Sequence, residues 1–149
     1  MKTRTALTLL FLLLIIALSG ILFFYSPSTR EALPVFDATV NRDCAPWDGA
    51  AFTVSIPHDS VSVITISIWK SPDFKFPTAF SLPDEAGQVG YAYILSELGP
   101  LIPMNGEVSF QRVEEGMPVE GRFSFTSERG EVFEGKFVAE WAGQITLCG

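Results

Sequence analysis

The sequence has a single histidine, His58, and only two cysteines, Cys44 and Cys148, among its 149 residues. So small a supply of imidazole and thiol excludes the usual ligand sets for zinc, copper or haem, because each of these needs several such side chains. The chain also lacks a glycine-rich phosphate loop, a Gly-x-Ser-x-Gly nucleophile elbow and a His-Glu-x-x-His helix. We therefore expect no cofactor, no metal and no enzymatic activity.

Basic side chains are scarce as well. Ten Lys and Arg residues stand against 17 Asp and Glu residues, which gives a formal net charge of -7. Nucleic acids and anionic lipid headgroups both attract basic surfaces, so the charge balance disfavours them as partners. An acidic surface is also an ordinary means of keeping a protein soluble, and by itself it indicates no specific partner.

Charge is absent altogether from residues 6–25, ALTLLFLLLIIALSGILFFY, which follow Lys2 and Arg4. At about 1.5 Å per residue, a helix of this length crosses the ~30 Å hydrocarbon core of a bilayer. A cleaved signal peptide is the alternative, although its apolar region usually has only about 7 to 15 residues. We expect residues 1–25 to be a retained signal-anchor in a bacterial cell membrane, with a cytoplasmic N-terminus. The remainder is then extracytoplasmic, or secreted if the segment is cleaved.

Residues 26–43 contain two prolines and little periodicity, which is typical of a linker, with a short strand expected near Val35–Val40. Residues 44–149 then form an extracytoplasmic domain that opens at Cys44 and ends beside Cys148. In a compartment that allows disulfides, two cysteines so placed predict a bridge between the ends of the domain. Two separate thiols are the alternative, since the sequence does not give the distance between them.

The exported part lacks helical signals. No segment after residue 25 has the 3.6-residue periodicity and the capping residues of a helix. Short runs instead alternate apolar and polar residues between glycines and prolines, as half-buried strands do. A hairpin is expected about His58–Ser60 and an edge strand near Thr78–Leu82. The predicted fold class is all-β: an antiparallel β-sandwich, Ig-like or related, of about seven to nine short strands, preceded by one N-terminal transmembrane helix.

The last two strands can be predicted residue by residue. The stretch SERG, residues 127–130, fits a three-residue hairpin loop with its glycine in the left-handed conformation. That register places Phe123 opposite Gly135 and Phe137 opposite Gly121. Each glycine would then be covered by a ring from the neighbouring strand, which compensates for the missing side chain. The phenylalanines of this pair are predicted to be core side chains.

Four amphipathic aromatic residues are better candidates for an exposed surface: Trp47, Trp69, Tyr91 and Tyr93. Tyr91 and Tyr93 share one face of their strand, and Trp69 points outward if the isoleucines of its own strand point inward. Such residues suit stacking on carbohydrate or contact with a protein, although plain packing at the rim of a domain is their more frequent use.

A cysteine ahead of the first strand, strands that begin with glycine and a terminal Leu-Cys-Gly resemble exported bacterial β-domains of unassigned function. The sequence predicts a non-catalytic, membrane-anchored β-domain that acts as a protein-interaction or structural module, for example an accessory subunit of a membrane complex. The alternative is a module that binds carbohydrate or another ligand, anchored or secreted. The expected partners are the lipid bilayer, through residues 6–25, and a protein of the cell envelope.

Overall fold

The computed structural model describes residues 32–70, 75, 77–83, 89–96, 99–143 and 146–148. The predicted transmembrane helix at residues 6–25 lies outside this part of the chain. Within the described residues, no helix is long and apolar enough to span a membrane. The described strands are β1 (Val35–Cys44), β2 (Ala50–Pro57), β3 (Ser62–Ile68), β4 (Thr78–Leu82), β5 (Gly90–Ser96), β6 (Ile102–Arg112), β7 (Val119–Ser127) and β8 (Val132–Trp141).

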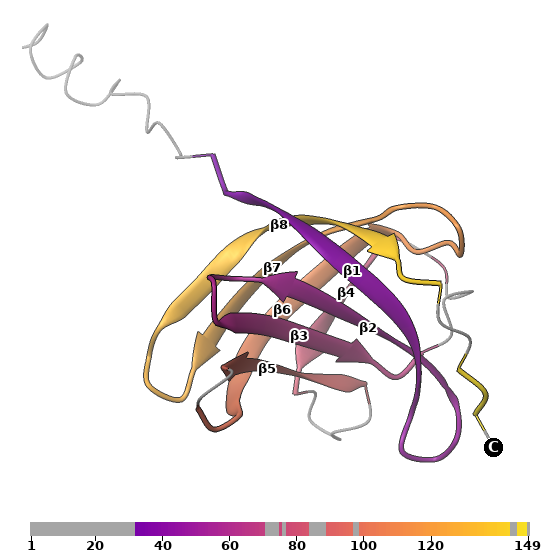
Figure 1. Ribbon diagram of the computed structural model, residues 1–149, viewed down its shortest axis with the longest axis horizontal. Helices are drawn as coiled ribbons and strands as arrows, with labels where there is room; N and C mark the ends of the chain where they lie inside the picture. The colour runs from indigo at the N-terminus through magenta and orange to yellow at the C-terminus, as the bar shows by residue number, and fades with distance from the viewer. Residues whose placement is uncertain are drawn as a thin grey trace, which may run out of the picture. The chain divides into compact units, whose positions relative to one another are not determined.

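The sheet closes on itself into a barrel and does not divide into the two layers of a sandwich (Figure 1). Its strand order is β4-β6-β5-β3-β2-β1-β8-β7, and β6 also pairs with β7. Seven strands therefore form the closed ring, while β4 pairs with β6 beside it. The predicted sandwich is wrong because β6 pairs with β7. This pairing closes the ring, whereas each sheet of a sandwich has two free edge strands.

The pairing that joins the two ends of the chain is parallel. β1 lies beside β8, with Phe36 next to Phe137 and Val40 next to Trp141, whereas the other pairings among the described strands are antiparallel. All of β1 except its last residue, Cys44, falls within residues 26–43, the range expected as a linker. The compact unit that contains the barrel begins at Leu33. The strand anticipated near Val35–Val40 is thus ten residues long and is part of the barrel wall.

One edge of β6 serves two partners in turn. Residues Ile102–Met104 pair with β5, and residues Gly106–Phe110 pair with β4. Gly106 lies where the partner changes, and a Cβ atom there would overlap the carbonyl oxygen of Ser124 on the opposite neighbour, β7. The close approach of the backbones explains why this position is glycine.

The β7–β8 hairpin has the predicted register. Phe123 pairs with Gly135 and Gly121 with Phe137, and Gly130 closes the turn with φ 80°. A Cβ on Gly121 would overlap the Phe137 ring, so this glycine is covered as predicted. The cover of Gly135 was predicted wrongly: a Cβ there would lie 2.5 Å from Cε2 of Phe36 on β1. The register of the β7–β8 hairpin could not predict this contact, because Phe36 belongs to β1 and lies near Gly135 only through the pairing of β1 with β8.

A disulfide joins the end of β1 to the C-terminal residues. The Cα atoms of Cys44 and Cys148 lie 5.5 Å apart, across a sequence separation of 104 residues. The Thr146 hydroxyl donates to the Arg42 carbonyl oxygen at 3.0 Å beside the bridge. The chain after β8 is therefore fastened along the same end of the barrel at which β1 finishes.

Candidate functional site

The four aromatic residues singled out in the sequence meet on the outside of the barrel. The ring of Trp47 contacts that of Trp69 edge-on, with centroids 5.5 Å apart and planes at 82°. Trp69 in turn contacts Tyr91 at 5.6 Å and 72°, and Tyr91 stacks on Tyr93 at 5.5 Å and 20°. These four residues are named the aromatic ladder. Three separate segments of the chain contribute to it: the β1–β2 loop, the end of β3, and β5.

The ladder is partly open to solvent. Trp47 is 56% exposed and Tyr91 39% exposed, whereas Trp69 and Tyr93 are half-buried. Adjacent exposed aromatic rings form a patch of a kind that is often a contact surface in folded proteins. If all four rings were buried, they could not contact a ligand. Because two of them are exposed, the ladder stays a candidate binding surface.

The loop between β1 and β2 presents Trp47 at its tip. The N–H of Asp48 donates to the Ala45 carbonyl oxygen at 2.9 Å, and the N–H of Ala45 donates to that of Gly49 at 2.8 Å. Asp48 has φ 60°, a left-handed conformation that aspartate tolerates better than most residues. A Cβ on Gly49 would lie 2.6 Å from Nε1 of Trp47. The missing side chain therefore lets the indole lie across the loop.

Strand alternation places the rest of the ladder outside. The isoleucines of β3 point inward and are fully buried, which puts Thr65, Ser67 and Trp69 on the outer face. Thr65 pairs with Tyr93 and Ser67 with Tyr91 across the β3–β5 ladder of hydrogen bonds. Both hydroxyl residues are nevertheless buried. The outer face of β3 thus has a small packed layer of its own, of which the aromatic rings are part.

Hydrogen bonds connect the base of the aromatic ladder with an acidic residue on β1. Thr53 Oγ1 donates to Oδ2 of Asp43 at 2.6 Å and lies 3.2 Å from Ser67 Oγ. Because a hydroxyl has one proton, Ser67 donates to Thr53 in this arrangement. Ser67 also shares a hydrogen bond with the Tyr91 phenol. A chain of hydroxyl groups therefore crosses four strands from Tyr91 to Asp43.

The surroundings of Tyr91 shift the pKa of its phenol. Burial raises the pKa of the Tyr91 phenol, the Ser67 hydrogen bond lowers it, and the charges of Tyr93 and Asp43 raise it, with a net upward shift. The phenol is therefore neutral near pH 7 and can donate its proton. Oδ1 of Asp43 accepts a second hydrogen bond, from the Cys44 N–H at 2.8 Å. Both carboxylate oxygens of Asp43 therefore accept a hydrogen bond from within the barrel wall.

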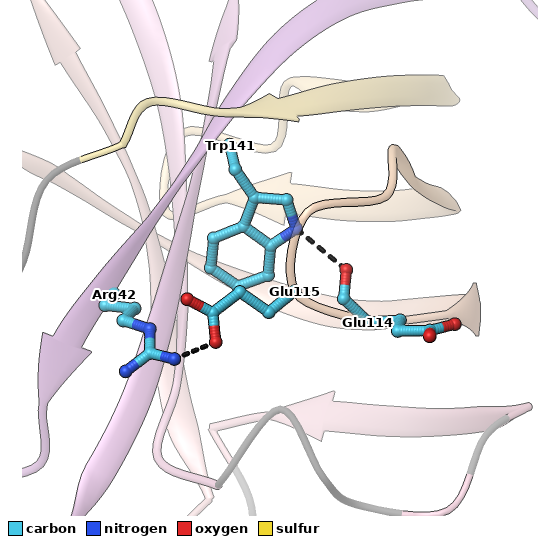
Figure 2. A network of polar contacts seen from close by, with 4 residues as sticks. All are labelled: Arg42, Glu114, Glu115 and Trp141. Carbon is cyan, nitrogen blue, oxygen red and sulfur yellow. Dashed lines mark hydrogen bonds and ion pairs between the residues drawn. The ribbon is translucent and has the colours of Figure 1, made fainter.

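A second polar cluster latches the loop between β6 and β7 onto the neighbouring strands (Figure 2). Arg42 of β1 forms an ion pair with Glu115, and Nε1 of Trp141 on β8 donates to the Glu114 carbonyl oxygen at 3.0 Å. A cavity of about 430 Å³ adjoins this latch, and the buried Oδ1 of Asn41, which helps to line it, lacks a hydrogen-bond partner. One unpaired acceptor does not make a ligand set, so the aromatic ladder is the stronger candidate site.

The histidine offers no catalytic arrangement. His58 is exposed in the β2–β3 turn, and its ring contacts that of Phe133 edge-on at 5.0 Å. Among the residues that the structure describes, no three His, Cys, Asp or Glu side chains gather into a metal site. The sequence did not predict the hydrogen-bonded cluster of Asp43, Thr53 and Ser67. The one signal in the sequence was that each of these residues lies on the polar face of an alternating strand.

Comparison of the chain with protein-family models, with curated proteins and with solved structures finds no match. The function must therefore be inferred from the chemistry of the surface itself.

Proposed function

We propose that this protein is a non-catalytic binding module of the bacterial cell envelope, anchored through residues 6–25, that contacts a partner protein through the aromatic ladder. The observation that carries the proposal is the meeting of four Trp and Tyr rings, from three chain segments, on the outside of the barrel. Trp and Tyr are enriched at protein interfaces because they combine a large apolar area with a polar edge.

The position of the ladder on the barrel supports this proposal. β1 starts at Val35, and the loop that presents Trp47 follows its last residue, Cys44 (Figure 1). Ten strand residues at about 3.3 Å each separate the two ends of β1 by roughly 30 Å. Trp47 therefore lies near the end of β1 opposite to Val35, and this separation from the start of the strand supports binding of a partner at the ladder.

Carbohydrate is the second candidate ligand. It is favoured by the exposure of Trp47, whose indole at the tip of the loop could stack on a sugar ring.

Capture of companion proteins from native membranes tests the proposal. Trp47→Ala removes the most exposed ring of the ladder. Val138→Ala is the matched control, because Val138 is 36% exposed on β8 and lies outside the ladder. We expect a companion in fixed ratio with the wild-type protein and with Val138→Ala, and its loss with Trp47→Ala. A companion that Trp47→Ala retains, or the absence of any companion, would contradict the proposal.

A further inference from the structure

We infer that the aromatic ladder receives an extended, arginine-containing segment of the partner. The inference rests on the proposed function and specifies the chemistry of the partner. Three features of the surface carry it: the angles between the rings, the exposed carboxylate next to Trp47, and the hydrogen bonds that already occupy the hydroxyl groups.

The ring angles suit a narrow flat group better than a sugar. The planes of Trp47 and Trp69 are nearly perpendicular, and so are those of Trp69 and Tyr91. The two contacts made by Trp69 therefore offer no common plane on which successive sugar rings could stack, and only Tyr91 and Tyr93 lie nearly parallel, at 20°. The exposed indole of Trp47 instead offers a ring face for a cation–π contact with a planar guanidinium.

One exposed carboxylate, that of Asp48, directly follows Trp47 in the chain. A second acidic residue, Asp43, precedes Trp47. Within the described residues neither forms an ion pair; the ion pair there joins Arg42 and Glu115. Because the whole chain has a net charge of -7, the wider field also attracts a basic ligand. A guanidinium can bind an aromatic face and a carboxylate at the same time.

The hydroxyl groups at the base of the ladder are already occupied. Thr53 Oγ1 donates to Oδ2 of Asp43 and is hydrogen-bonded to Ser67 Oγ, which is also a hydrogen-bond partner of the Tyr91 phenol. Ser67 is also buried, so a ligand does not reach it. Recognition of a sugar needs free donors and acceptors around the stacking ring, whereas recognition of a guanidinium needs only acceptors and ring faces. This difference favours the basic segment.

The direct test is titration of the full-length protein, in uncharged detergent, with a short Gly- and Ser-rich peptide that contains two arginines. Tryptophan fluorescence reports binding, since two of the four ladder rings are indoles. The matched peptide has citrulline at both positions, which keeps the planar shape and removes the charge. We expect the arginine peptide to bind about tenfold more tightly than the citrulline peptide, and less tightly as salt is raised.

Variants of the protein locate the site. Asp43→Asn and the more exposed Asp48→Asn should each weaken binding of the arginine peptide. Gly49→Ala keeps all four rings but displaces the indole of Trp47, so it should weaken binding about as much as Trp47→Ala. Val138→Ala should bind like the wild type. Equal binding of the two peptides, or binding that Trp47→Ala leaves unchanged, would overturn the inference.

Two further outcomes separate this inference from the proposed function. If neither peptide binds while Trp47→Ala still abolishes capture of the companion, the inference fails and the proposed function stands. Binding of a β-1,4-linked glucose pentasaccharide that depends on Trp47, without binding of the arginine peptide, would also overturn the inference and would assign the ladder to carbohydrate.

Discussion

Closure of the barrel through β1 and β8 predicts how Gly135 responds to a side chain. An alanine Cβ at this position would lie 2.5 Å from Cε2 and 3.0 Å from Cδ2 of Phe36, and 3.2 Å from the Pro34 carbonyl oxygen. Carbon atoms pack best at about 3.5 to 4.0 Å, so the Phe36 ring has to move. Overpacking of this kind costs about 1 to 3 kcal/mol, and Gly135→Ala should lower the free energy of unfolding by that amount.

Shortening the ring should relieve the overlap. Phe36→Leu removes Cε2, the nearer of the two colliding ring carbons, and leaves only a methyl group at the position of the other. This change should itself cost about 1 kcal/mol, because Phe36 is only half-buried. In this background Gly135→Ala should cost less than about 1 kcal/mol, the remainder coming from this methyl group and the Pro34 carbonyl. The double-mutant cycle should then give a coupling of about 1 to 2 kcal/mol. Phe123→Leu is the comparison variant: Phe123 pairs with Gly135 within the hairpin, and its ring contacts that of Phe36, so it should give less relief than Phe36→Leu.

Urea denaturation of the full-length protein in uncharged detergent, followed by tryptophan fluorescence, measures each free energy of unfolding. Relief of the Gly135→Ala penalty by Phe123→Leu, and not by Phe36→Leu, would refute the reasoning. The ring over Gly135 would then belong to the hairpin, and β1 would not lie in the register that closes the barrel.

The disulfide, the Tyr91 phenol and the loop latch each predict a measurable effect. Cys148→Ser opens the 104-residue connection to Cys44 and should cost about 4 to 5 kcal/mol by loop entropy, seen as a lower urea midpoint. Because the folded pKa of Tyr91 is raised from 10.0, its contribution to stability is complete below that pH and is lost as pH rises through the folded pKa. Tyr91→Phe should therefore reduce the fall in stability in alkaline denaturation series. Trp141→Phe removes the donor to Glu114 and should cost about 0.5 to 1.5 kcal/mol, with faster amide exchange in the latched loop only.

Local patterns predicted the local structure well. The β7–β8 register followed from one glycine turn, the edge strand Thr78–Leu82 from its prolines, and the buried isoleucines of β3 from alternation. The sandwich was wrong because strands of a sandwich and of a barrel have the same alternation of buried and exposed residues. The two differ in long-range pairing, and the deciding contacts, such as Phe36 beside Phe137, join residues about 100 positions apart.

The residues of the candidate site could be predicted from the sequence, but their arrangement could not, because it also depends on long-range pairing. Trp47, Trp69, Tyr91 and Tyr93 could be chosen one at a time, because each combines an apolar body with a polar edge. Their meeting depends on β3 pairing with β5 instead of β4, which no local signal indicates. The hydroxyl chain to Asp43 needs the order and register of four strands, so it becomes visible only in the folded structure.

The parallel pairing of β1 with β8 has a mechanical consequence. If the protein is anchored and bound as proposed, a pull between the anchor and the partner would act along β1, which is hydrogen-bonded to β2 on one side and to β8 on the other. Sliding β1 lengthwise strains both rows of hydrogen bonds together, whereas peeling would break them one after another. The disulfide at Cys44 holds the far end of the same strand. Force applied lengthwise to β1 would therefore be resisted by both rows of hydrogen bonds at once.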